Sequence, residues 1–325
     1  MRDRLLRPLP WLALAFLAAL SIPLLGSRFY TSVATDILIL GLFATSLNIL
    51  LGTTGLVSFG HAAYFAIGAY ACAIAMKTYE VPFGLALLAA GLIAAIAALV
   101  FGYFCVRLTK IYFAMLTLAF AQIVWAICFK WNAVTGGEQG FANVPYPDMS
   151  LLEALPVLEN MRASEHYFYL TLVVVAASLL VLRRITNSPF GRILTTIREN
   201  PERAEFVGID VQRFELAAFV IAGLFAGIAG ALFGVFNRGV FPDFGYWAKS
   251  AEVLIMVILG GMGQFFGPLI GAFTLVILNQ QITSYTEYWP LVLGLLLIVL
   301  LYTFPAGITG GLKDFFAFLR RRRDA

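Results

Sequence analysis

Long runs of apolar residues alternate with short polar connections along almost the whole chain. The runs cover roughly residues 9–26, 34–51, 55–76, 82–106, 111–129, 167–182, 214–236, 246–260, 265–281 and 288–305. Most are close to the length that a helix needs to cross a hydrocarbon core of ~30 Å. In lipid every backbone polar group must be paired within the protein, which a helix achieves by itself. The pattern predicts an all-α fold, a polytopic helical membrane bundle with about 8–10 transmembrane helices and Gly-broken segments, in which residues 1–325 form a single transmembrane domain.

Two parts of this map leave alternatives open. The first run follows a basic stretch, as in a secretory signal, but it is long and lacks a small-x-small cleavage site, so we expect a retained span. The runs 246–260 and 265–281 are short and are separated by "GGMGQFFGP". They form either two thin spans or one re-entrant hairpin, and both options return the chain to the same side.

The charges in the connections predict an orientation. One side holds both termini, the turn at Arg107 and Lys110 and the segment 183–213, and it carries a net charge of +8 against −4 on the other side. An excess of Lys and Arg in short loops marks the cytoplasmic face. We therefore predict that both termini are cytoplasmic, that 183–213 is a cytoplasmic loop and that 130–166 is an extracytoplasmic loop.

The composition limits the classes of function that the chain can have. Hydrophobic residues make up 61% of the chain and charged residues 12%, which fits a membrane protein rather than a soluble domain. The middles of the spans hold almost no ionisable side chains, which argues against a proton-coupled carrier. The phosphate-binding pattern G-x-x-x-x-G-K-[ST] is absent, so this chain does not hydrolyse ATP by that route. The sequence predicts a non-enzymatic transport protein without a cofactor or metal, either passive or powered by another chain.

Small residues recur inside the spans. Glycines 223, 227, 230 and 234 have helical spacing, which predicts close helix packing. Cys72, Cys105 and Cys128 all lie in apolar runs, and we expect them to be small packing residues and not disulfide partners or metal ligands.

Two glycine-broken stretches, "LGTTGLVSFGH" (51–61) and "GGMGQFFGP" (260–268), interrupt the apolar pattern. Irregular backbone at membrane depth is tolerated only where it is buried in protein or lines a water-filled cavity. The stretches are therefore either part of a transport pathway or turns at the membrane interface. Small polar groups among apolar walls suit an aliphatic zwitterion, so the pathway candidates are Ser58, His61, Tyr64, Gly260 and Gly263. His61 taken alone also fits a packed or interfacial histidine.

The stretch "IRENPERAEFVGI" (197–209) concentrates charge within an apolar chain. Asn200 is a favourable N-cap, Pro201 suits the first helical position, Glu202 complements the helix dipole, and Gly208 is a natural C-terminal stop. These signals predict a helix over 201–207.

Inside that helix, Ala204 and Val207 would form a narrow apolar strip. So short a helix is marginal in isolation and needs a surface to dock on. That surface is either the membrane face of the protein itself or a cytoplasmic partner.

Longer motifs point to a known family. The segments "SPFGRILTTIRENPERAEFVGIDVQRFELAAFVIAGLFAGIAGAL" (188–232), "ILGGMGQFFGPLIGAF" (258–273), "GLVSFGHAAYFAIGAYA" (55–71) and "TGGEQGF" (135–141) resemble the LivM-type permease subunits of ATP-binding-cassette importers for branched-chain amino acids. The resemblance runs over roughly residues 35–305. Leu56 departs from it, because such permeases often carry Gln there.

The resemblance implies a multi-pass subunit of the cell inner (cytoplasmic) membrane that passes branched-chain (aliphatic) amino acids from a periplasmic binding protein to the cytoplasm. It implies further partners, namely two cytoplasmic ATPase subunits, a second homologous permease subunit and the lipid bilayer, with no nucleic acid. A coupling helix that seats in a cleft of an ATPase is implied at Arg198, Glu199, Asn200, Pro201, Glu202, Arg203, Ala204 and Gly208. The acidic loop 130–166 is expected to form part of the docking site for the binding protein. Alternatives are a related importer of urea or short amides and a passive channel or carrier.

Overall fold

The computed structural model describes residues 27–148 and 162–283, together with Pro23 and short stretches between 288 and 311. Eight helices account for most of this part and agree with eight of the ten expected apolar runs. They are α3 (Arg28–Asn48), α4 (His61–Thr78), α5 (Phe83–Cys105), α6 (Lys110–Lys130), α9 (Ala163–Thr186), α12 (Val211–Phe236), α13 (Trp247–Gly260) and α14 (Gly267–Thr283). The expected all-α bundle is confirmed, while the run 9–26 and most of 288–305 lie outside the described residues.

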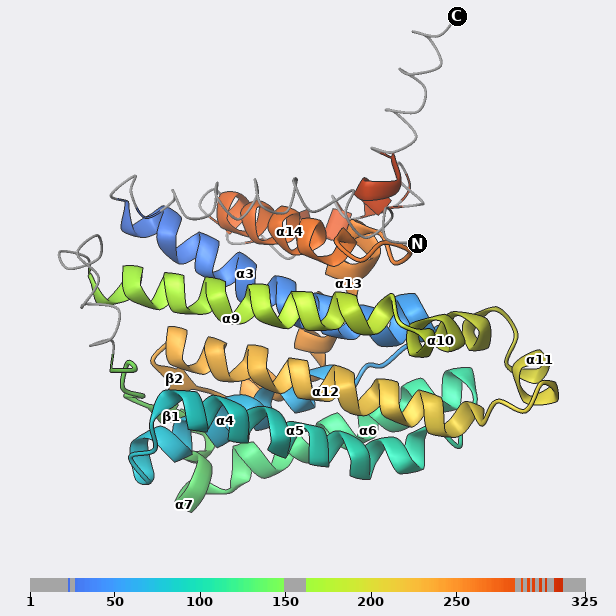
Figure 1. Cartoon of the computed structure of the whole chain (residues 1–325). Coiled ribbons are helices and arrows are strands. Elements are labelled where there is room, and N and C mark those ends of the chain that lie inside the picture. Colours follow the sequence, from blue (N-terminus) through green and yellow to red (C-terminus); the bar gives the residue numbers. More distant parts are fainter. Residues whose placement is uncertain are drawn as a thin grey trace, which may run out of the picture.

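Shorter elements gather at the two ends of the bundle. A π-helix, η2 (Ile49–Thr54), continues α3. It packs against α10 (Pro189–Glu199), which in turn contacts α11 (Pro201–Phe206). The opposite end holds α7 (Asn132–Thr135), η3 (Gly137–Gln139), η4 (Pro242–Gly245) and the strands β1 (Phe141–Ala142) and β2 (Gly239–Val240), which pair antiparallel. Figure 1 shows these as the α11 end and the β1–β2 end, with α5, α9 and α12 running between them.

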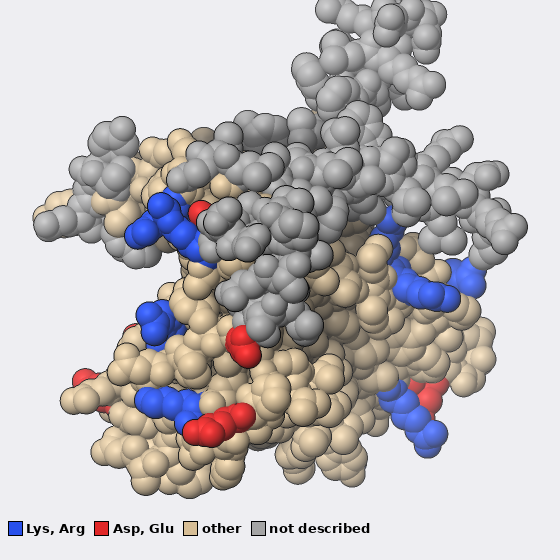
Figure 2. Space-filling view, turned by 60° about the vertical axis from the view of Figure 1, so that its left-hand side comes forward, with Lys and Arg blue, Asp and Glu red and all other residues tan. Residues whose placement is uncertain are grey.

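An apolar belt surrounds the bundle between its ends. Within the described residues, five helical stretches are long and apolar enough to cross a membrane, namely Arg28–Thr54, Phe83–Cys105, Ile111–Lys130, Ala163–Thr186 and Val211–Phe236. Large apolar side chains such as Leu92, Ile96 and Ile111 are exposed, as is expected where lipid replaces water. Figure 2 shows charged side chains near the two ends, with an uncharged band between them on the face that is not grey.

The pair α13 and α14 is shorter than the other spans. Helix α13 has 14 residues, which at ~1.5 Å per residue gives about 21 Å, less than a hydrocarbon core. The two helices pack against each other, and the turn 261–266 joins them. This length favours the hairpin alternative over two complete spans.

Helix α12 is the centre of the packing, and its glycines make this possible. A Cβ atom added to Gly230 would lie 1.9 Å from the carbonyl oxygen of Phe65, and one added to Gly68 would lie 2.1 Å from that of Gly227. The expected close packing along the glycine face of α12 is therefore confirmed, against α4 in particular. Cys72, Cys105 and Cys128 are buried free thiols, as expected of packing residues.

Candidate functional site

The sequence signals for a short helix after residue 200 are confirmed by α11. The side chain of Asn200 accepts a hydrogen bond from the backbone N–H of Arg203 at 2.9 Å, and Pro201 occupies the first turn. Gly208 has φ +86°, the left-handed conformation that glycine adopts without strain. The helix ends at Phe206, one residue before the expected position.

Helix α11 lies beyond the ends of the long helices (Figure 1). Ala204 is fully buried and attaches it to the bundle, but Val207 is 75% exposed, so the expected strip of Ala204 and Val207 is half wrong. The reason is the tight turn in which the N–H of Ile209 donates to the carbonyl of Ala204 at 3.1 Å. This turn brings Ile209 back to the core and leaves Val207 and Phe206, which is 89% exposed, at the tip.

Helix α10 connects α11 to the interior. It is amphipathic, and it buries Leu194 and Ile197 against the bundle. From its last turn, Arg198 donates a hydrogen bond through Nη1 to the carbonyl oxygen of Gly52 in η2. The aliphatic part of the same side chain covers Gly55, whose added Cβ would lie 2.9 Å from Cγ of Arg198. Arg198 therefore joins the charged segment to the first glycine-broken stretch.

The two glycine-broken stretches, far apart in sequence, meet at the α11 end. The side-chain amide of Asn48 donates to the carbonyl of Gln264 at 3.3 Å. A Cβ atom on Gly52 would lie 2.3 Å from the carbonyl oxygen of Met262, so the backbones approach as closely as glycine permits. Thr309 also donates from Oγ1 to the carbonyl of Gly260. These contacts close the bundle at the α11 end.

The pathway candidates of the first stretch lie deeper, in the packed core. His61 is fully buried at the start of α4, where Nε2 lies 2.8 Å from Oγ of Ser46 and the ring stacks on Phe43. Ser58 is also fully buried, and Tyr64 packs edge-on against Phe219 at a centroid distance of 5.5 Å. Their role in a pathway stays a prediction.

The candidates of the second stretch differ from one another. Gly260 is buried, and its backbone touches that of Gly267, while Gly263 is exposed with open space around it. The structure thus brings the two stretches together through Gly52, Met262 and Gln264, residues that were not among the candidates.

A cavity of about 930 Å³ opens at the β1–β2 end, a site that the sequence did not reveal. Its charged wall residues, Asp36, Asp243, Lys249 and Glu252, come from α3, η4 and α13. Lys249 and Glu252 form an ion pair of 2.8 Å. The remaining walls are contributed largely by apolar residues of the same helices and of α14, including Leu40, Ile255, Leu275 and Val276. None of the five predicted pathway residues lines this cavity.

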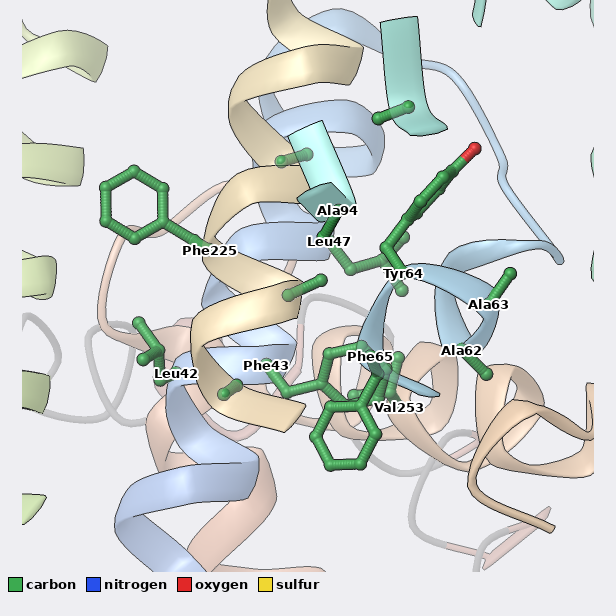
Figure 3. Packing of buried hydrophobic residues seen from close by; sticks show 14 of the residues in the cluster. Leu42, Phe43, Leu47, Ala62, Ala63, Tyr64, Phe65, Ala94, Phe225 and Val253 are labelled. Atoms are coloured by element: carbon green, nitrogen blue, oxygen red, sulfur yellow. The ribbon is translucent and has the colours of Figure 1, made fainter. Parts of the chain in front are cut away.

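Aromatic rings separate the cavity from the broken stretches. Phe233 in the cavity wall lies 5.4 Å from Phe65, Phe65 lies 4.4 Å from Phe43, and Phe43 stacks on His61 at 5.2 Å between ring centroids. Figure 3 shows Phe43 and Phe65 side by side next to Val253 of α13. The described part of the chain is therefore hollow at the β1–β2 end and packed from the aromatic layer to the α11 end.

Comparison with known proteins connects this architecture to transport. Residues 29–301 match the model of the family described as "Branched-chain amino acid transport system / permease component". The chain is 32% identical over 306 residues to the high-affinity branched-chain amino acid transport system permease protein LivM of Escherichia coli (strain K12). This alignment covers 89% of this chain and 72% of that protein.

A second kind of relative is also similar. The permease protein LivH of the same organism is 29% identical over 282 residues, covering 83% of this chain and 90% of LivH. The probable branched-chain amino acid transport permease protein LivM of Methanocaldococcus jannaschii is 23% identical over 239 residues, covering 69% and 67%. No solved structure matches the chain.

Proposed function

The chain belongs to the family of branched-chain amino acid transport permeases, and from this premise we propose that it is the membrane subunit of an ATP-binding-cassette importer in the cell inner membrane. Its substrates are branched-chain, aliphatic amino acids, which it passes from a periplasmic binding protein to the cytoplasm. The family match over residues 29–301 carries this proposal. The apolar tip of α11 supports it, because Phe206 and Val207 are large apolar side chains left exposed, as at an interaction surface.

The partners follow from the same premise. Relatives of the LivM and LivH kinds both resemble this chain, which supports a pairing with a second, homologous permease subunit. Two cytoplasmic ATPase subunits supply the free energy, since the chain has no phosphate-binding loop of its own. The binding protein docks at the β1–β2 end, on the extracytoplasmic side, where the loop 130–166 begins and ends.

The coupling route begins at the tip of α11. Phe206 and Val207 are large apolar side chains that an ATPase cleft would bury, and the charges of Glu202 and Arg203 lie beside them. A displacement of α11 passes to α10 directly, since Asn200 both ends α10 and caps α11. From α10 it reaches η2 through Arg198.

The η2 segment then transmits the displacement to the closed end of the bundle. Gly52 touches Met262, and Asn48 is hydrogen-bonded to Gln264, so a movement of η2 separates or tightens the two broken stretches. The cavity at the β1–β2 end and the closed α11 end correspond to a state that accepts substrate from outside. Parting of the broken stretches and of the aromatic layer at Phe43 and Phe65 would complete the passage inward.

Reconstitution tests the proposal. The complex that copurifies with the tagged chain is placed in proteoliposomes with the binding protein outside, on the side of the β1–β2 end, and uptake of labelled leucine is measured with and without ATP in the lumen. We expect uptake that requires both ATP and the binding protein. Leucine flux that persists without ATP identifies a channel or carrier, and ATP-driven uptake of urea or acetamide without leucine uptake identifies the related importer.

A further inference from the structure

We propose that the cavity at the β1–β2 end is an acceptor site for an α-amino acid zwitterion, in which Asp36 and Glu252 receive the ammonium group and Lys249 receives the carboxylate. This inference rests on the proposed function and adds to it a defined place where the permease itself holds the substrate. The cavity volume of about 930 Å³ lies within the range of small-molecule sites, which is ~300–1,000 Å³.

The first observation is an unsatisfied carboxylate. The Oδ1 atom of Asp36 is buried and has no hydrogen-bond partner among the described residues, and Asp36 lines the cavity. A buried acceptor without a partner is energetically costly, and a charged one more so. An ammonium group in the cavity would bring the opposite charge beside this carboxylate, which lines the wall.

The second observation is the cation on the adjoining wall. Lys249 and Glu252 are one helical turn apart on α13, at 2.8 Å, and their side chains are 18% and 31% exposed. With Asp36 and Asp243 they offer both signs of charge within one cavity, and a ligand that carries both signs can engage Lys249 as well as the carboxylates. When a ligand carboxylate approaches Lys249, its ammonium replaces Lys249 as the partner of Glu252, so Lys249 and Glu252 each keep a partner of opposite charge.

Most of the remaining wall is apolar, with Asn279, Gln280 and Thr283 of α14 as its uncharged polar residues. Leu40, Ile255, Leu275 and Val276 line the cavity together with the charged groups. Burial of an aliphatic side chain against these residues is favourable, because it removes apolar surface from water. The combination of paired charges and aliphatic walls selects an amino acid with a branched apolar side chain over a polar solute such as urea.

Because it opens at the β1–β2 end, this cavity is the first place on the pathway where the substrate binds. It adjoins Phe233, behind which Phe65 and Phe43 close the way to His61. A substrate released at the β1–β2 end therefore meets the charged groups before the aromatic layer. Asp243 and Tyr246, from the segment that follows β2, line the same opening.

Direct binding tests the site. The complex that copurifies with the tagged chain is placed in lipid nanodiscs without binding protein and without nucleotide, and binding of labelled leucine is measured. We expect saturable binding that weakens at least about tenfold in Asp36→Asn and in Lys249→Gln, as for the loss of a hydrogen bond to a charged group. The matched control is Glu80→Gln, an exposed carboxylate in the turn between α4 and α5 that does not line the cavity; it should bind leucine as the wild type does.

Two competitors separate contact from structural damage. Isopentylamine has the ammonium group without a carboxylate, and isocaproate has the carboxylate without an ammonium. Asp36→Asn should weaken binding of the amine and spare isocaproate, whereas Lys249→Gln should do the reverse. Equal loss for all three ligands in both variants, unchanged leucine affinity in both, or absence of saturable leucine binding to the wild type overturns the site.

A third variant tests the same cavity without changing a charged residue. Ala251 lines the cavity, so Ala251→Leu adds volume there without altering a charge, and we expect it to weaken leucine binding as well. The proposed function is tested separately, by measuring ATP-driven uptake of leucine. ATP-driven leucine uptake that is identical in the wild type and these variants refutes the site and leaves the function standing, whereas absence of leucine uptake by the wild type refutes the function.

Discussion

Arg198 of α10 donates a hydrogen bond to the backbone carbonyl of Gly52, a residue 146 positions earlier in the chain. This bond connects the charged segment that projects from the bundle to the stretch where a long helix is broken. A side chain that joins two elements through a backbone carbonyl transmits displacement without requiring a particular partner side chain. The contact therefore gives a physical route from α11 to the closed end of the bundle.

Loss of this contact should uncouple transport from ATP hydrolysis. In Arg198→Ala we expect ATP-driven leucine uptake to fall about tenfold while the ATPases still copurify, because α11 itself is unchanged. The free energy of unfolding should change by less than about 1 kcal/mol, since the side chain is exposed. Arg192→Ala, an exposed arginine of the same helix, is the control; an equal loss of uptake there would show that the effect does not depend on the contact with Gly52.

Charge on α11 should decide whether the ATPases bind. The double variant Glu202→Arg with Arg203→Glu keeps the net charge but inverts its pattern, and we expect it to weaken copurification of the ATPases while the chain stays in the membrane. The control swaps charges at the opposite end, Glu80→Arg with Lys130→Glu, both exposed. Unchanged complex formation and uptake in the α11 variant would remove the docking role.

The apolar tip of α11 should matter as much as its charges. Phe206 is 89% exposed, so Phe206→Ala should alter the free energy of unfolding by no more than about 0.5 kcal/mol. Large apolar side chains at the centre of an interface often account for 2 kcal/mol or more of binding, so the affinity for the ATPase should fall about thirtyfold. The measurement is titration of the detergent-solubilised permease with purified ATPase. An unchanged affinity would mean that the tip stays outside the interface.

The turn that ends α11 should depend on the left-handed backbone conformation of Gly208. Gly208 has φ +86° with open space around its Cβ position, so substitution there acts through the backbone alone. Gly208→Val should cost at least about 1–2 kcal/mol of local conformational energy and reduce uptake, whereas Gly208→Asn, which tolerates this conformation, should retain most of it. Comparable uptake in both variants, measured at equal expression, would show that the turn is not under constraint.

Much of the fold follows from the sequence because membrane helices leave a strong local signal. Apolar length predicted the eight long helices, and the Asn200, Pro201 and Gly208 signals predicted α11 to within a residue. Val207 was misplaced because the turn that returns the chain through Ile209 depends on backbone hydrogen bonds that apolar periodicity does not encode.

The candidate site was harder to predict because its parts are remote in sequence. Asp36 and Lys249 belong to segments that are remote in the sequence, and only the packing of α3 beside α13 places them on one cavity. The broken stretches were identified from their glycines, but their mutual contact through Gly52 and Met262 is a property of the tertiary structure.

That contact gives the last prediction. A Cβ atom on Gly52 would lie 2.1 Å from Oδ1 of Asn48 and 2.3 Å from the carbonyl oxygen of Met262, and neither distance is possible for a real side chain. Gly52→Ala must therefore push η2 away from the turn 261–266, at a cost of about 1–3 kcal/mol of overpacking. The displaced backbone opens the α11 end, which the contact otherwise closes.

The opening is measured with a reporter cysteine at Thr54, which is buried at 3% exposure, in a background where the three native cysteines are serine. We expect a membrane-impermeant maleimide that is applied at the α11 end to label this cysteine several-fold faster in Gly52→Ala than in its parent. The control is Gly84→Ala, where an added Cβ atom meets nothing within 4 Å. Equal labelling rates in the two variants would show that η2 and the turn 261–266 move together, so that the closure of this end lies elsewhere.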